Sequence, residues 1–193
     1  MTDHTPTLTR AQLQAAVGRS IPDVVAADLA VLFVGINPGL VSGATGHHFA
    51  RRGNRFWPVL HDAGFTPRQL RPDEQAELPA MGLGITNLVA RATATAAELS
   101  AAELRAGAHA LEAAVARLRP RYAAFLGVTT YRTAFGQRAA AVGPQAGELG
   151  GARVWLLPNP SGLNAGWSRA RLTEAYARLR RAALPHPRDA DQG

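Results

Sequence analysis

The chain has 193 residues, of which 47% are hydrophobic and 18% charged, a composition typical of one folded α/β domain rather than of a disordered chain. All 21 basic residues are arginine and 14 residues are acidic, so the formal charge is +7 and favours an anionic partner such as nucleic acid. Lysine and cysteine are both missing, which excludes a side-chain Schiff base, a Walker phosphate loop, a disulfide, a thiolate nucleophile and a cysteine-held iron–sulfur cluster.

The sequence predicts no targeting segment. Residues 1–10 lack an apolar core behind a positive charge, so they do not form a signal peptide. The longest uncharged run, residues 29–50, contains glycines and Asn37-Pro38, and is a strand followed by a loop rather than a membrane span. We therefore expect a cytoplasmic protein with no membrane contact. A single domain is expected over residues 1–193, with flexible tails at 1–8 and 184–193.

Helix and strand patterns alternate along the first half of the chain. A Thr-x-x-Gln capping box at Thr9 predicts a short helix with Leu13 and Val17 on its apolar face. The continuous apolar run 29–36 is typical of a strand buried on both faces of a parallel sheet, and a glycine-rich loop follows it to Gly53. Two helices and a strand come next, at 55–63, 73–81 and 84–89.

The second half continues this alternation. Ser100 and Glu103 form a capping box that begins the longest amphipathic helix, which Pro120 ends. Strands are predicted at 122–126 and 154–157, and helices at 130–135 and from Ser168 to 183. The pattern predicts a three-layer α/β/α sandwich around a mostly parallel sheet. Because ligands bind outside the carboxyl ends of such strands, the loops after the first and last strands are the candidate site.

The first of these loops begins at Asn37. This asparagine comes directly after a buried strand, so its side chain is held rigidly and can orient a water molecule as acceptor and donor. Gly39 allows close approach of a backbone or a flat ligand. A plain turn explains the same residues and is favoured for this loop taken alone. His47 and His48 are adjacent without further ligands, which makes a poor zinc site.

The second loop, residues 156–167, also follows a buried strand. It presents Asn159, Ser161 and Asn164, with Leu163 between a glycine and an asparagine at the tip. An apolar side chain on such a tip can act as a wedge that enters a base stack. The alternative is that Leu163 packs under its own loop, which is the default for a single leucine.

Considered together, the two loops are a more specific signal of function than either alone, because each places Asn-Pro directly after a buried strand. The segments GINPG (35–39) and NPSGL (159–163) resemble the two signature motifs of the mismatch-specific uracil-DNA glycosylases, the bacterial Mug and thymine-DNA glycosylase branch of the uracil-DNA glycosylase superfamily. The similarity extends through the blocks 54–57, 63–65 and 84–86. Another branch has an acidic residue and a tyrosine in the first motif, and the thermophilic branches carry an iron–sulfur cluster, which the missing cysteine excludes.

The resemblance implies a monofunctional enzyme that flips uracil and related bases out of mismatched duplex DNA, mainly opposite guanine. Hydrolysis of the N-glycosidic bond then leaves an abasic site for base excision repair. Asn37 matches the residue that holds the attacking water, while Ile36, Gly39, Ser42 and Phe49 surround the base. The family uses no cofactor, and no metal site is expected.

In the second motif, the resemblance makes Leu163 the wedge that fills the gap left by the flipped base. Gly162 and Asn164 flank it and contact the opposite base, whereas Asn159 and Ser161 belong to the part that grips phosphate. Family members often have Ser-Arg after the wedge, where this chain has Asn164-Ala165. How strictly the opposite base is read therefore stays open. The implied partner is double-stranded DNA, bound by a monomer associated with the bacterial nucleoid.

The absence of lysine bears on the mechanism independently, because no side-chain amine can trap an abasic sugar and lyase activity is not expected. Two other functions remain open. A non-catalytic sensor of damaged or mismatched DNA would use the same wedge and basic surface. A small-nucleotide binding domain is disfavoured, because no glycine-rich phosphate fingerprint follows the first strand.

Overall fold

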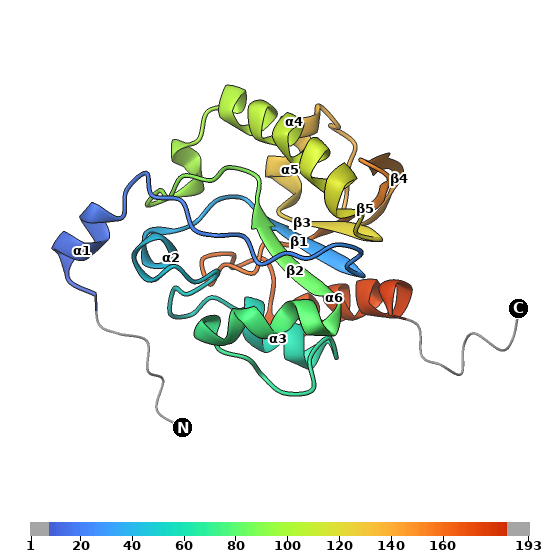
Figure 1. Cartoon of the computed structure of the whole chain (residues 1–193), viewed down its shortest axis with the longest axis horizontal. Coiled ribbons are helices and arrows are strands. Elements are labelled where there is room, and N and C mark those ends of the chain that lie inside the picture. Colours follow the sequence, from blue (N-terminus) through green and yellow to red (C-terminus); the bar gives the residue numbers. More distant parts are fainter. Residues whose placement is uncertain (1–7, 185–193) are drawn as a thin grey trace, which may run out of the picture.

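The computed structural model describes residues 8–184 and contains a five-stranded sheet with helices on both faces (Figure 1). The expected flexible tails lie outside the described residues, apart from Leu8 and Leu184. The strands are β1 (Val31–Gly35), β2 (Leu83–Asn87), β3 (Tyr122–Leu126), β4 (Gly143–Leu149) and β5 (Ala152–Leu157). Their order is β2-β1-β3-β5-β4, and only the β4–β5 pair is antiparallel. The predicted mostly parallel α/β/α sandwich is therefore confirmed.

The helices divide between the two faces of the sheet. They are α1 (Arg10–Ala15), α2 (Leu40–Thr45), α3 (Phe56–Asp62), α4 (Ala101–Leu118), α5 (Val128–Phe135) and α6 (Arg169–Ala183), with 3-10 helices η1 (Pro72–Met81) and η2 (Ala96–Glu98). One face is covered by α3, α6 and η1, the other by α4 and α5 (Figure 1). The predicted capping boxes at Thr9 and Ser100 are present, and Ser168 caps α6.

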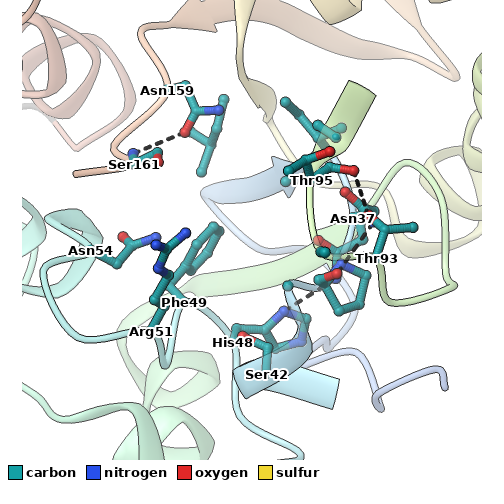
Figure 2. A pocket seen from close by; sticks show the side chains of 18 of the residues that line it. Asn37, Ser42, His48, Phe49, Arg51, Asn54, Thr93, Thr95, Asn159 and Ser161 are labelled. Carbon is teal, nitrogen blue, oxygen red and sulfur yellow. Dashed lines mark hydrogen bonds between the residues drawn. The ribbon is translucent and has the colours of Figure 1, made fainter. Parts of the chain in front are cut away.

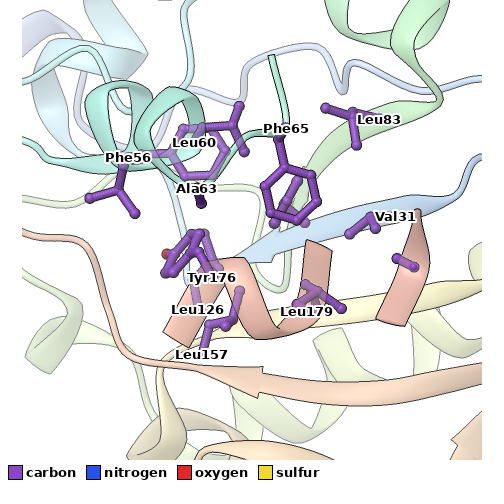
Figure 3. Packing of buried hydrophobic residues seen from close by; sticks show 14 of the residues in the cluster. Val31, Phe56, Leu60, Ala63, Phe65, Leu83, Leu126, Leu157, Tyr176 and Leu179 are labelled. Atoms are coloured by element: carbon purple, nitrogen blue, oxygen red, sulfur yellow. The ribbon is translucent and has the colours of Figure 1, made fainter. Parts of the chain in front are cut away.

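Alternate residues of the buried strands supply two apolar clusters, as the twofold period of a strand requires. In β1, Phe33 enters the cluster under α3 and α6, and Leu32 enters the cluster under α4 and α5. Phe33 is fully buried. Its ring centroid lies 5.5 Å from that of Phe56, 5.3 Å from Phe65 and 6.4 Å from Tyr176. Figure 3 shows Phe65 and Tyr176 among the other apolar side chains of this cluster. β1 is thereby fixed between two helical layers.

The structure adds two elements that were not predicted, β4 and α2, and specifies the type of a third, the predicted helix at 73–81. The strand β4 was not predicted, because it begins with Gly143 and Pro144 and most of its residues are exposed. As the last strand of the sheet it pairs on one side only, so it tolerates a sequence that a central strand would not. The helix predicted at 73–81 is a 3-10 helix with Pro79 inside it, where the missing N–H disfavours the α-helical ladder. The short helix α2 lies inside the expected glycine-rich loop.

The prediction that the first helix buries an apolar face is wrong. α1 buries none of its residues, and Val17, beyond its end, is 48% exposed. The capping box therefore sets where α1 begins, but the helix contributes no residue to the two clusters. No helix in residues 8–184 combines the length and the apolar character needed to cross a membrane.

Replacement of Phe33 by alanine should cost about 3–5 kcal/mol of unfolding free energy, because it empties the centre of an aromatic cluster. Val17→Ala removes an exposed apolar side chain and should change stability by less than about 0.5 kcal/mol. Urea unfolding of both variants measures the difference. Similar values for the two would contradict the packing described for β1.

Candidate active site

A pocket of about 300 Å³ opens where β1, β2, β3 and β5 end at one edge of the sheet. Three segments form most of its wall: the first loop at residues 36–50, residues 93–96 after β2, and the part of the second loop beyond β5, residues 158–167. Figure 2 shows Asn37, Thr93 and Thr95 on one side and Asn159 and Ser161 on the other. Among the predicted site residues, those that line the pocket are Ile36, Asn37, Gly39, Ser42, Phe49, Asn159, Ser161 and Leu163. Gly162 and Asn164 lie in the second loop but outside the lining.

The side chain of Asn37 is held in one orientation. Its Nδ2 donates to the carbonyl of Arg91 at 3.0 Å and to Thr93 Oγ1 at 2.7 Å. The Thr93 hydroxyl gives its own proton to the carbonyl of Thr95 at 2.8 Å, so it can only accept from Asn37. A flipped amide would place Asn37 Oδ1 against two acceptors. Oδ1 is therefore left for a molecule in the pocket.

The residues that orient Asn37 are themselves fixed. Thr93 is 1% exposed, and its N–H donates to the carbonyl of Pro38 at 3.1 Å. The Arg91 guanidinium pairs with Glu103 at 2.6 Å and lowers the pKa of this carboxyl to about 2, with help from Ser100 at the start of α4. Sequence reasoning missed Thr93 and Arg91. The one sequence feature that could have indicated them is their position after β2, which ends at the same edge of the sheet as β1.

Phe49 lines the pocket with a strained backbone. Its φ is +55°, a value that non-glycine residues rarely adopt. The ring stacks on Phe56 with centroids 4.1 Å apart, so one face is packed and the ring still borders the cavity. Its neighbours are tied down, because Ser42 Oγ accepts from the N–H of Ala50 at 3.3 Å and Trp57 Nε1 donates to the carbonyl of His48 at 3.1 Å. The Phe49 N–H has no partner among residues 8–184.

A buried hydrogen-bond network centred on His48 lies beside Phe49. His48 is 1% exposed, and its Nε2 lies 3.0 Å from the carbonyl of Pro22. Because a carbonyl only accepts, Nε2 carries the proton and Nδ1 accepts from Asn87 Nδ2, 3.4 Å away. Burial lowers the pKa of His48 and keeps the ring neutral. A Cβ on Gly35 would lie 2.6 Å from Asn87 Oδ1, so a larger residue here would displace the amide that contacts His48.

The contacts of this histidine are to backbone and amide groups rather than to further metal ligands. Across residues 8–184, no three His, Asp or Glu side chains gather closely enough to hold a metal ion.

The second loop is closed by its own side chains. Asn159 Oδ1 accepts from the N–H of Ser161 at 2.9 Å, and Ser161 Oγ accepts from the N–H of Leu163 at 3.3 Å. Asn164 Nδ2 donates to the carbonyl of Asn159 at 3.0 Å. Leu163 is 72% exposed at the tip. The alternative that it packs under its own loop is therefore wrong.

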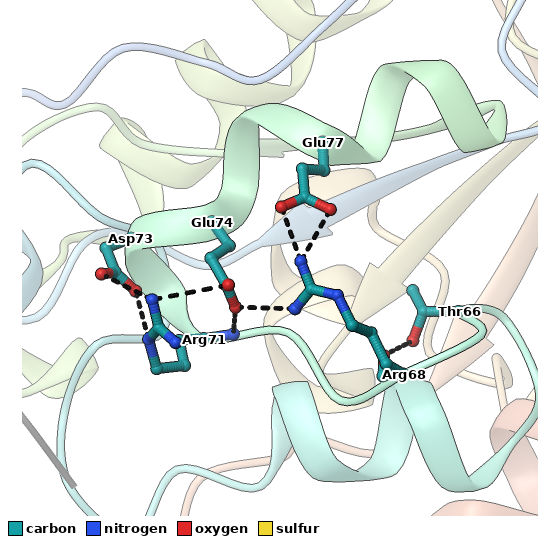
Figure 4. Close-up of polar contacts among 6 residues, drawn as sticks. All are labelled: Thr66, Arg68, Arg71, Asp73, Glu74 and Glu77. Atoms are coloured by element: carbon teal, nitrogen blue, oxygen red, sulfur yellow. Dashed lines mark hydrogen bonds and ion pairs between the residues drawn. The ribbon is translucent and has the colours of Figure 1, made fainter.

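The rim of the pocket carries positive charge that no carboxylate of residues 8–184 neutralises. Arg51 and Arg52 are exposed, Arg51 lines the pocket, and neither forms an ion pair within the described part of the chain. Arg68 and Arg71, by contrast, are paired with acidic residues along η1 (Figure 4), namely Asp73, Glu74 and Glu77. The arginines at the rim therefore favour an anionic ligand.

Comparison with known proteins identifies a family and similar solved structures. The model of the family described as "Uracil DNA glycosylase superfamily" matches residues 22–180. The fold is similar to the solution NMR structure of "a putative Uracil DNA glycosylase" from Methanosarcina acetivorans, with a TM-score of 0.59 and 19% identity. That match covers 85% of this chain and 97% of the other. It supports the fold, and the family match covers both pocket loops.

The buried His48 makes stability depend on pH. Since folding lowers its pKa from 6.5, the stabilising contribution is present above that value and is lost as the pH falls through the folded-state pKa. The unfolding free energy, measured in urea between about pH 7 and about pH 5, should therefore fall more for the wild type than for His48→Gln. His109→Gln, exposed on α4, should keep the wild-type dependence. The same dependence in all three proteins would contradict the neutral, buried ring.

Proposed function

The chain belongs to the uracil DNA glycosylase superfamily, and we propose that it hydrolyses the N-glycosidic bond of uracil in mismatched duplex DNA, mainly opposite guanine. The observation that carries this proposal is the locked amide of Asn37. Its Nδ2 is committed to Arg91 and Thr93, and its Oδ1 is left for a ligand of a pocket that Arg51 lines, an arginine with no ion pair within residues 8–184. A bound water molecule would accordingly be held in one position.

The proposed chemistry follows from what an amide can do. Asn37 has no useful pKa and is a poor base, so its Oδ1 orients the water by accepting one hydrogen bond. The C1′–N1 bond must therefore break ahead of attack, with its electron pair on the base and oxocarbenium character on the sugar. The water oxygen then bonds C1′, and in the net reaction one of its protons ends on the released uracil. The product is an abasic site.

Groups around the base would stabilise the departing anion. We assign the free N–H of Phe49 and the backbone near Ile36 and Gly39 as donors to uracil oxygens. The Phe49 ring would stack on the flipped base, a contact worth about 1–3 kcal/mol. Ser42, whose Oγ already holds Ala50, supports this wall of the pocket. Related pyrimidines would enter the same space.

The second loop would act on the duplex rather than on the bond. Leu163 would fill the gap that the flipped base leaves. Gly162 and Asn164 would contact the opposite guanine. Because Asn164 Nδ2 is bound to Asn159, its Oδ1 is the group that can accept from the N–H donors on the pairing edge of guanine. Ser161 would contact the phosphate, which positions the enzyme without reading sequence. Since no lysine is present, we propose hydrolysis without lyase activity and without a cofactor.

Incubation with a G·U duplex, followed by alkaline cleavage, should produce strand scission above a control without enzyme. Asn37→Ala should lower the single-turnover excision rate by about 10²-fold or more, because the water is no longer placed, while duplex binding persists. Gln137→Ala removes an exposed amide from a position after α5 and should cleave like the wild type. Binding without scission by the wild type would indicate a non-catalytic sensor, and normal cleavage by Asn37→Ala would refute the role of the amide.

Leu163→Ala should weaken binding to mismatched and abasic duplexes more than it slows excision from single-stranded DNA, where no gap needs filling. Val17→Ala, the loss of another exposed apolar side chain, is the matched control and should leave both unchanged. Fluorescence anisotropy with labelled duplexes and single-turnover kinetics on single strands give the two values. Equal losses on both substrates would count against a wedge.

A further inference from the structure

One arginine bonds the second loop at several points. Arg55 occupies the N-cap position of α3, and its Nη2 donates to the carbonyls of Ser161 at 2.6 Å and Asn164 at 3.1 Å. Its Nη1 donates to the carbonyl of Trp167, and its Nε contacts the carbonyl of Pro160 at 3.4 Å. The backbone N–H of Arg55 also donates to Pro160, at 3.0 Å. One half-buried residue thus binds four carbonyls of a loop more than 100 positions away in the chain.

The two segments also approach each other without side chains. A Cβ on Gly162 would lie 2.5 Å from the carbonyl oxygen of Gly53, so the tip of the second loop rests directly on the backbone that precedes α3. No carboxylate pairs with Arg55 within residues 8–184. Its charge is therefore balanced by the carbonyl dipoles of the loop. A guanidinium offers five N–H donors in a rigid plane, whereas the ammonium of lysine is a compact charge with three donors and cannot reach these carbonyls together.

We infer that Arg55 is a positioning residue for Leu163: it holds the second loop in the shape in which this leucine projects into a base stack. The inference rests on the proposed function. An exposed apolar side chain on an unsupported loop would be ordered only when DNA binds, and the cost would appear as lost affinity and rate. With Arg55 in place, the loop is ordered when the protein folds. Arg55 then acts through Leu163 and does not touch the DNA.

This role predicts a selective defect. Because a wedge matters only where a flipped base leaves a gap, Arg55→Met should lower single-turnover excision from a G·U duplex about tenfold, the scale of ordering a few side chains on binding. Excision from a single strand should change less than about twofold. Arg55→Lys should resemble Arg55→Met. Arg119→Met, which breaks a surface pair with Asp28 at the opposite edge of the sheet, is the matched control and should cleave both substrates normally.

A double-mutant cycle tests whether Arg55 works through the wedge. Arg55→Met should add less than about twofold to the duplex defect of Leu163→Ala, because the side chain that it positions is gone. If the double variant instead shows a rate loss equal to the product of the two single-variant losses, the inference is overturned. The inference is also overturned if, in Arg55→Met, the slope of log DNA affinity against log salt concentration falls in magnitude by about one. That result would make Arg55 a phosphate contact instead.

Hydrogen exchange of the protein without DNA supplies a measurement that does not depend on activity. In Arg55→Met, the amides of residues 159–167 should exchange faster, while those of β1 stay at the wild-type rate in a protein of similar melting temperature. Unchanged exchange in the loop would overturn the inference even if excision is lost. If the wild type excises uracil from neither substrate, the proposed function fails, and the exchange result still decides whether Arg55 orders the loop.

Discussion

The parallel pairing of β1 with β2 and β3, and of β3 with β5, is the constraint on which the rest of the molecule depends. It brings the carboxyl ends of these strands to one edge. Segments that follow Gly35, Asn87 and Leu157 therefore meet there, although up to 122 positions separate them in the chain. The two apolar clusters make this pairing rigid, since β1 is buried on both faces. The pocket is a consequence of the sheet topology rather than of any one loop.

At this edge of the sheet, the neighbouring hydrogen-bond acceptors determine the orientation of the polar side chains. Asn37 can present only its Nδ2 to the carbonyl of Arg91 and to a Thr93 hydroxyl that has already given its proton away. His48 can present only Nε2–H to the carbonyl of Pro22, which leaves Nδ1 to accept from Asn87. For these two side chains, only one arrangement of donors and acceptors satisfies the neighbouring groups. The pocket is thereby organised before a ligand arrives.

The sequence predicts the sandwich, the capping boxes and both pocket loops, because these depend on local periodicity and on motifs of a few residues. Thr93, Asn87 and the carbonyl contacts of Arg55 could not be predicted, since each involves partners far away in the chain and no local pattern marks them. The same reason applies to β4, whose glycines and proline are acceptable only because it is an edge strand. Local signals define elements, whereas the sheet order defines which side chains meet.

The most direct test of the account is the structure of this protein bound to a duplex that carries 2′-fluoro-2′-deoxyuridine opposite guanine. The fluorine destabilises positive charge on the sugar and so preserves the glycosidic bond. The account predicts uracil stacked on Phe49, Leu163 in the vacated base stack, and a water molecule within hydrogen-bond distance of Asn37 Oδ1 and in line with C1′. A uridine that stays paired in the helix, or a water held by another residue, would contradict it.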